Sequence, residues 1–132
     1  MRDHVDAVKA LLEAHEIDSY WVDVPGSPKY PYVLLWGPAW GNSVEGAASG
    51  DKPMDRPLMA TCVAENADVL LTFVELVKTI LDRAQPAVPG RHAALYYRRS
   101  EVVDVDRKIT IPITNRHPAF AVENYRYRSQ QL

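Results

Sequence analysis

The segment "NADVLLTFVELVKTILDRAQ" (66–85) constrains the fold most, because its apolar residues recur at helical spacing over its whole length. Asn66 can cap the first turn, and Pro86 ends the helix. At 1.5 Å per residue such a helix is about 30 Å long, enough to cross a whole sheet. Its apolar stripe consists of Leu70, Phe73, Val74, Val77, Ile80, Leu81 and Ala84.

Short segments rich in β-branched and aromatic residues surround this helix and predict strands. They are 19–24, 32–37, 57–64, 92–99, part of 101–114, and 119–128. Residues 4–15 predict a short amphipathic helix at the N-terminus, and 25–31 predict a turn rich in proline. We therefore predict one α+β domain over residues 1–132, with both helices packed on a mostly antiparallel sheet.

The strand predicted at 32–37 is apolar on both of its faces. Tyr32, Leu34 and Trp36 alternate with Val33 and Leu35. A strand that faces water on one side normally alternates apolar with polar residues. We therefore expect this strand to be covered on both faces.

A loop of residues 37–56 separates this strand from the next. Loops of that length are uncommon in compact domains and are usually functional or disordered. An active-site lid, a disordered spacer and an arm that contacts another subunit would share this composition. Trp36, Trp40 and Met54 do not suit a spacer, so we interpret the loop as a contact arm.

Composition narrows the class of protein further. The chain has 132 residues, the size of one ordinary domain. No apolar run approaches the roughly 20 residues that span a bilayer. The N-terminal sequence lacks the apolar core of a signal peptide, and the single cysteine, Cys62, allows no internal disulfide. These features predict synthesis in the cytoplasm.

Charge is distributed unevenly along the chain. Residues 1–90 hold 7 Lys and Arg against 13 Asp and Glu, whereas residues 91–132 hold 8 against 4. The net charge is thus −6 for residues 1–90 and +4 for residues 91–132, and this difference has two possible explanations. Solvated faces vary in charge, or an acidic part of one copy meets a basic part of another.

A search for catalytic or metal-binding patterns finds none. The four histidines are scattered without metal-ligand spacing, and no CxxC pair exists. We expect exposed polar roles for His4 and His15, a loop role for His117 and a buried thiol at Cys62. The segment "GNSVEG" (41–46) lacks the glycine that a nucleophile elbow needs two residues after Ser43. We therefore predict no catalytic residue, no cofactor and no metal.

The C-terminal segment "HPAFAVENYRYRSQQL" interleaves tyrosines with arginines. Such a pattern can track a nucleic-acid backbone, but it also arises in a strand with Tyr on one face and Arg on the other. We favour the strand. Tyr and Arg are also enriched in protein interfaces. The predicted interface residues are Trp36, Trp40, Met54, Arg98, Arg99, Phe120, Tyr125, Arg126 and Arg128.

The order of elements, with the phrases "VDVPGSPKYPYVLLWG" and "HPAFAVENYRYRS", resembles the tail terminator proteins of long-tailed bacteriophages, especially those of actinobacterial hosts. The resemblance spans nearly the whole chain. It implies an α+β structural protein without cofactor that forms a hexameric ring, caps the tail tube and stops its elongation. It also implies contacts with the major tail tube protein and the head-completion proteins, in the neck of a virion assembled in the host cytoplasm. Genomic DNA would pass through such a ring without sequence-specific binding.

Other classes of function stay open at this point. A head-closure or other neck component would share the lack of chemistry, a small hydrolase would need Ser43 or Cys62 beside a histidine, and a ligand-binding domain would use the loop as a lid. For a ring, we expect Arg98, Arg99, Arg126 and Arg128 on one side of each contact. The acids expected opposite them are Glu45, Asp51 and Asp55.

Overall fold

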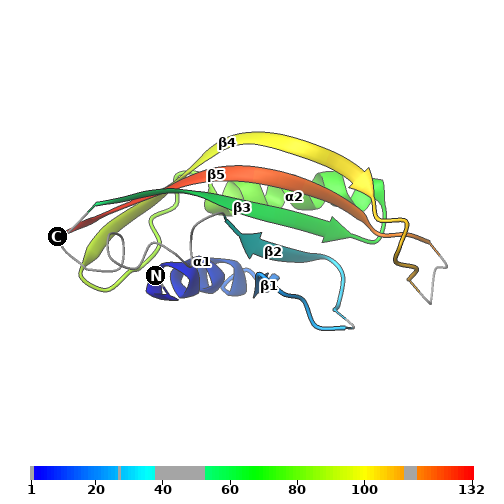
Figure 1. Ribbon diagram of the computed structural model, residues 1–132, viewed down its shortest axis with the longest axis horizontal. Helices are drawn as coiled ribbons and strands as arrows, with labels where there is room; N and C mark the ends of the chain where they lie inside the picture. The colour runs from blue at the N-terminus through cyan, green and yellow to red at the C-terminus, as the bar shows by residue number, and fades with distance from the viewer. Residues whose placement is uncertain (1, 27, 38–52, 112–115) are drawn as a thin grey trace.

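The described residues of the chain fold as two helices and a five-stranded, mostly antiparallel sheet, which confirms the α+β prediction (Figure 1). The computed structural model describes residues 2–26, 28–37, 53–111 and 116–132. The elements are α1 (Arg2–Glu13), β1 (Asp18–Trp21), β2 (Tyr32–Trp36), β3 (Met54–Ala64), α2 (Ala67–Leu81), β4 (Arg91–Val105) and β5 (Ala119–Gln131).

Three long strands make up most of the sheet, whose order is β1-β2-β3-β5-β4. Strand β5 lies between β3 and β4 and pairs antiparallel with both. Among the described strands, only the short edge strand β1 runs parallel to its neighbour, β2. The segment predicted at 92–99 and the first residues of the segment predicted within 101–114 form one strand, β4, which ends at Val105 and whose register shifts near Arg99 and again near Val102.

The sheet has two different faces because side chains alternate along each strand. The inner face packs against both helices, and its buried residues share one core with Val8 and Leu12 of α1 and Leu70 and Val77 of α2. The opposite face, here called the outer face, is covered by no helix within the described part of the chain (Figure 1). It carries Tyr32, Leu34, Trp36, Asp55, Pro57, Met59, Thr61, Val63, Tyr96, Phe120, Val122, Asn124, Arg126 and Arg128.

The prediction that β2 is covered on both faces is wrong for two residues. Val33 and Leu35 are fully buried on the inner face, but Leu34 and Trp36 on the outer face are only half-buried. Trp36 donates a hydrogen bond from its indole Nε1 to Thr61 Oγ1 over 2.9 Å, which satisfies its polar atom without a second layer. Apolar residues on both faces therefore do not mark two covered faces in this strand.

Helix α2 begins as predicted and ends earlier than predicted. Asn66 Oδ1 accepts a hydrogen bond of 2.9 Å from the Val69 amide, as an N-cap does. The helix ends at Leu81, not near residue 85, because Arg83 adopts a positive φ of 62° and its amide donates to Leu95 O. The chain thus leaves the helix to bond with β4.

Helix α1 contradicts one prediction, that His4 is exposed. His4 is only 3% exposed. The reason is its position, since His4, Val8 and Leu12 follow one another at four-residue intervals and lie on one side of a helix. His15 lies beyond the end of the helix and is exposed, as predicted.

The N-cap of α2 provides a direct test of this local structure. We expect Asn66→Ala to lower the free energy of unfolding by about 1 kcal/mol, because the Val69 amide loses its acceptor. Urea denaturation measures the change. Asn66→Asp, which keeps a side-chain acceptor, should stay within a few tenths of a kcal/mol of the unchanged protein. An equal loss in both variants would contradict the assignment, because Asp keeps the acceptor that the Val69 amide needs.

Candidate protein interface on the outer face of the sheet

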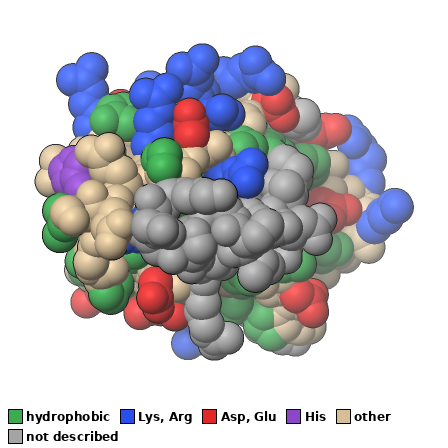
Figure 2. Space-filling view, turned by 60° about the vertical axis from the view of Figure 1, so that its left-hand side comes forward, with side chains coloured by type: hydrophobic (Ala, Val, Ile, Leu, Met, Phe, Trp, Pro, Cys, Tyr) green, Lys and Arg blue, Asp and Glu red, His purple; other side chains and the backbone are tan. Residues whose placement is uncertain are grey.

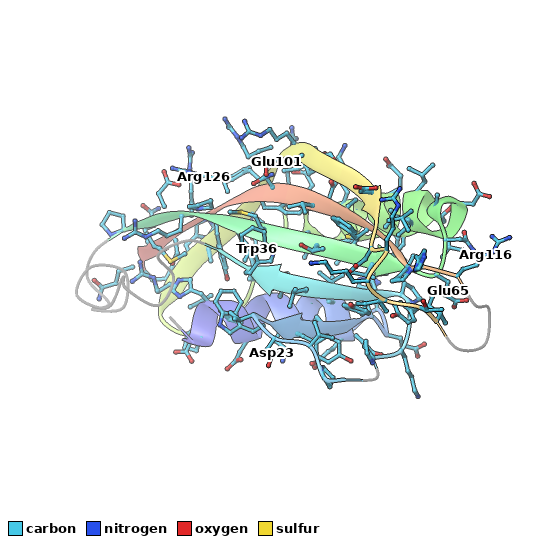
Figure 3. All side chains as sticks on the ribbon, turned by 45° about the vertical axis from the view of Figure 1, so that its right-hand side comes forward. Asp23, Trp36, Glu65, Glu101, Arg116 and Arg126 are labelled. Carbon is cyan, nitrogen blue, oxygen red and sulfur yellow. The ribbon has the colours of Figure 1, made fainter. Side chains whose placement is uncertain are left out.

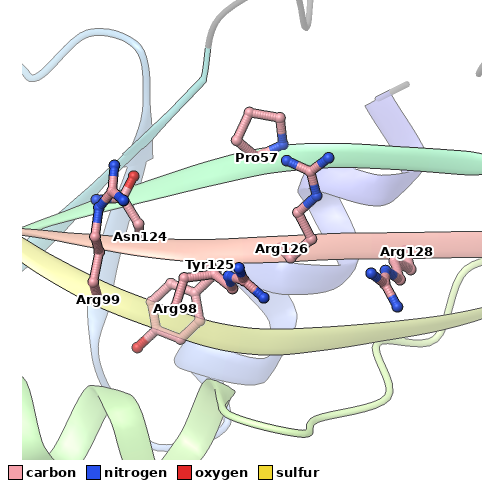
Figure 4. Close-up of a pocket in the computed structure, with 7 residues that line it drawn as sticks. All are labelled: Pro57, Arg98, Arg99, Asn124, Tyr125, Arg126 and Arg128. Carbon is pink, nitrogen blue, oxygen red and sulfur yellow. The ribbon is translucent and has the colours of Figure 1, made fainter.

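Four arginines gather on the outer face of β4 and β5 (Figure 4). Arg126 and Arg128 are two residues apart on β5, so both point to the same side of the sheet. Arg98 and Arg99 lie where the register of β4 shifts, which places both of them beside the same hollow. Lys and Arg side chains accordingly gather along the upper part of the molecule in Figure 2.

Carboxylates partly compensate these arginines. Asp55 on β3 accepts from Arg126 Nε over 2.6 Å and lies 3.6 Å from Arg128 Nε. Glu101 lies 3.0 Å from Arg99, and Arg126 and Glu101 project from the same side of the sheet (Figure 3). The hydrogen bond from Arg99 lowers the pKa of Glu101 from its ordinary value.

We expected Asp55 to face the arginines from a neighbouring copy. In the structure it pairs with Arg126 of its own subunit. Asp55 pairs with Arg128 in the register between β3 and β5, so it belongs to the same surface as the arginines. Cross-strand neighbours of opposite charge are a common stabilising pair in sheets. The other two expected acids, Glu45 and Asp51, lie outside the described residues.

The outer face is hollowed where the arginines lie. One hollow of about 420 Å³ is bordered by the four arginines together with Pro57, Asn124 and Tyr125. A second, of about 480 Å³, lies beside it, and its lining includes Asp55, His92, Tyr96 and Arg128. The Arg128 guanidinium stands 5.8 Å from the centre of the Tyr96 ring, within the range of a cation–π contact.

The structure brings together most of the predicted interface residues but not all of them. Trp36, Arg126 and Arg128 share the outer face, with Phe120 on the same face farther along β5. Tyr125 and Met54 point into the core and are 1% and 3% exposed in the single subunit, although each borders one of the hollows. Met54 also begins β3, so the loop predicted to end at residue 56 ends before it. Trp40 lies outside the described residues.

A buried polar cluster at one end of the sheet was missed by the sequence analysis. His4 Nε2 lies 2.9 Å from Ser129 Oγ, which also accepts a hydrogen bond of 2.5 Å from Arg91 Nε. Tyr127 donates to the backbone oxygen of His4 over 2.9 Å. The alternation of β5 could have indicated the cluster, since Ser129 follows Tyr125 and Tyr127 at a spacing of two.

This cluster has the arrangement of a structural contact. Ser129 is 4% exposed, so a substrate does not reach its hydroxyl. Burial, with the nearby Arg91, lowers the pKa of His4 to about 4, and the imidazole is neutral at pH 7. Its Nδ1 has no hydrogen-bond partner among the described residues, whereas in a catalytic triad a carboxylate orients this nitrogen.

The remaining candidate residues are also far from catalytic geometry. Cys62 is fully buried, as predicted, and burial raises the pKa of its thiol. His117 Nδ1 lies 2.6 Å from the backbone oxygen of Ile109, which supports the predicted loop role. Among the described residues, no group of three His, Cys, Asp or Glu side chains is placed to hold a metal ion. Ser43 lies outside them.

Comparison with known proteins identifies no family. No protein-family model matches the chain, and no curated protein shows significant sequence similarity to it. Within the described residues, neither helix is long and apolar enough to cross a membrane.

The His4 cluster predicts a pH dependence of stability. Because the pKa of His4 is about 4 in the folded protein and about 6.5 when unfolded, the unfolded chain binds more protons between these values. Stability should therefore fall as pH drops from 6.5 to 4 and lose this dependence below 4. We expect His4→Gln to be less stable than the unchanged protein at pH 7, with the difference shrinking by pH 4.5. A difference that is constant over this range in urea titrations would contradict the assignment.

Proposed function

We propose that this protein is a structural component of a bacteriophage tail, which assembles into a ring, caps the tail tube and stops its elongation. The resemblance of its sequence to tail terminator proteins motivates the proposal. The observation that carries it is the outer face, where four arginines and exposed Tyr96 border two hollows, half-buried Trp36 lies on the same face, and no helix of the described residues covers it. Aromatic residues and arginine are the types that most often anchor protein contacts.

The polar chemistry of the described residues supports an assembly role over a hydrolase. The Ser129–His4 pair and Cys62 are buried, and three of the four arginines beside the hollow, Arg99, Arg126 and Arg128, pair with carboxylates. Hydrolysis needs a nucleophile that a substrate can reach, together with a group that takes its proton. Neither condition is met by these groups, whereas a broad polar and aromatic face suits a protein partner.

A ring also suits the unequal distribution of charge. Rings use heterologous contacts, in which one surface of a subunit meets a different surface of the next. Such contacts can place opposite charges against each other, whereas a two-fold dimer brings like patches together. The proposed partners are further copies of this chain, the tube protein below the ring and the head-completion proteins above it, in the neck of the virion.

Charge reversal on the outer face tests this function. We expect Arg126→Glu with Arg128→Glu to lower the fraction of preformed tail tubes that the protein caps by about tenfold or more at 0.1 M salt. Negative-stain electron microscopy counts capped tubes, and circular dichroism checks that the variant is folded. The effect should weaken toward 1 M salt, where the Debye length shortens to about 3 Å.

A matched control changes the same amount of charge elsewhere. Arg107 and Arg116 lie in the connection between β4 and β5 and are exposed, so Arg107→Glu with Arg116→Glu should cap tubes normally. Normal capping by the folded Arg126/Arg128 variant at every salt concentration would contradict the role of the outer face. Failure of the unchanged protein to cap tubes would contradict the function itself.

A further inference from the structure

We infer that the arginine-lined hollow of one copy receives the exposed side of helix α2 of the next copy. This inference rests on the proposed function, because it names the surface that forms the ring contact. The exposed side of α2 meant here consists of Asp68, Val69, Thr72, Glu75 and Leu76.

Helix α2 is unusually apolar on the side that faces away from the core. Of the seven large hydrophobic residues exposed among the described residues, three lie on α2: Val69, Leu71 and Leu76, with 42%, 60% and 46% of their surface exposed. Val69 and Leu76 are seven residues apart, so they stand one above the other on the helix. They form an apolar ridge that the described residues of the subunit leave exposed.

Two acidic residues follow this ridge. Asp68 and Glu75 are also seven residues apart and lie on the side of Val69 and Leu76 that is farthest from the core. The exposed side of α2 therefore presents an apolar row and an acidic row, with Thr72 between them. Apolar anchors bordered by charge are the usual composition of a specific contact.

The outer face offers the complementary surface. Exposed Tyr96 lies beside Arg128 and borders the second hollow, where it can pack against Leu76 of another copy. The four arginines would then face Asp68 and Glu75. A ridge of two side chains can seat in a hollow of about 420–480 Å³.

The two surfaces cannot meet within one subunit. Helix α2 packs on the inner face of the sheet, and the arginines stand on the outer face. The exposed side of α2 is thus on the opposite side of the molecule, and only a second copy can bring the two together. A contact between different surfaces propagates to a third copy, which produces a closed ring or an open chain.

Helix α1 is the competing acidic surface. Asp3, Asp6 and Glu13 are exposed on it. No large hydrophobic residue of α1 within the described part of the chain is exposed, however. Ion pairs at exposed positions contribute little by themselves, so a contact needs the apolar residues that α2 supplies.

Nucleic acid is the other class of partner for an arginine cluster, and the local charge disfavours it. Asp55 and Glu101 stand among the four arginines, which leaves a net charge of +2 from these six groups. A phosphate backbone binds through the release of counterions by unneutralised cations. The carboxylates of Asp55 and Glu101 would repel the phosphates, whereas a protein partner can place its acidic residues next to the arginines and away from these two carboxylates.

Cysteine cross-linking of the full chain tests the contact. Leu76→Cys and Tyr96→Cys are made in separate proteins, and the buried native Cys62 serves as an unreactive background. The two proteins are mixed on preformed tail tubes and exposed to a short bis-maleimide. We expect a cross-linked dimer from the mixture and little from either protein alone, because the contact joins different surfaces. A protein carrying both substitutions should give a series of cross-linked oligomers, the largest of which is the complete ring.

The control places the cysteine on α1. Ala10→Cys is exposed there, and its mixture with Tyr96→Cys should cross-link at least about tenfold less than the Leu76→Cys mixture. Cross-linking of Ala10→Cys in preference to Leu76→Cys would overturn the inference. Dimers from Tyr96→Cys alone would also overturn it, since they indicate a contact between identical surfaces.

Charge reversal provides a second, independent measurement. We call the cross-link between the cysteines introduced at positions 76 and 96 the 76–96 cross-link. Asp68→Arg with Glu75→Arg should slow its formation, and Arg126→Glu with Arg128→Glu should do the same, because each pair places like charges against each other. When the two charge-reversed proteins are mixed, the reversed α2 of one protein meets the reversed arginine surface of the other. Their charges are again opposite, so the cross-linking rate of this pair should be restored. If the cross-linking rate were not restored, the contact with α2 would be contradicted. It would also be contradicted if a short DNA duplex competed with cross-linking and the Arg126→Gln protein no longer bound that duplex.

Failure of the inference differs from failure of the function. Capped tubes without the 76–96 cross-link would leave the ring function in place and remove α2 from its contact. The 76–96 cross-link in free protein that caps no tubes would keep the contact and remove the tail function.

Discussion

The pairing between β3 and β5 determines what each side of this molecule presents. It runs without a break from Met54 opposite Ser129 to Ala64 opposite Ala119. Because side chains alternate along a strand, this register sends Tyr125, Tyr127 and Ser129 into the core and Arg126 and Arg128 outward. A slip by one residue would exchange the two sets and bury the arginines. Both the core and the candidate interface therefore depend on this one register.

The inward residues of β5 also hold the first helix in place. Tyr127 donates to the His4 backbone, and Ser129 joins the His4 ring to Arg91 on β4. The two contacts of His4 link residues more than a hundred positions apart in the sequence. On the outward side, Arg126 and Arg128 both pair with Asp55. The same strand thus stabilises the subunit with one side and presents charge with the other.

Local patterns in the sequence predicted most of the fold. The stripe of α2 and its cap at Asn66 were visible because helical spacing is a short-range property. The alternation of Tyr and Arg in β5 was visible for the same reason. The early end of α2 at Leu81 was not, because it follows from a hydrogen bond between Arg83 and Leu95 across the turn into β4.

The site was less predictable than the fold because it depends on which strands are neighbours. Met54 and Tyr125 were assigned to the interface by residue type, and only the register shows that they point inward. Asp55 was placed opposite the arginines by charge, although β3 and β5 make it their neighbour. The burial of His4 was detectable from its spacing to Val8 and Leu12, but its partner Ser129 was not.

A three-dimensional reconstruction of tail tubes capped by this protein tests the central claim most directly. The account predicts a closed ring on the end of the tube, with Arg126 and Arg128 of each copy buried against the Asp68 and Glu75 side of α2 in the next. A ring in which the arginine-lined hollows face solvent, or tubes that carry no density for the protein, would contradict it.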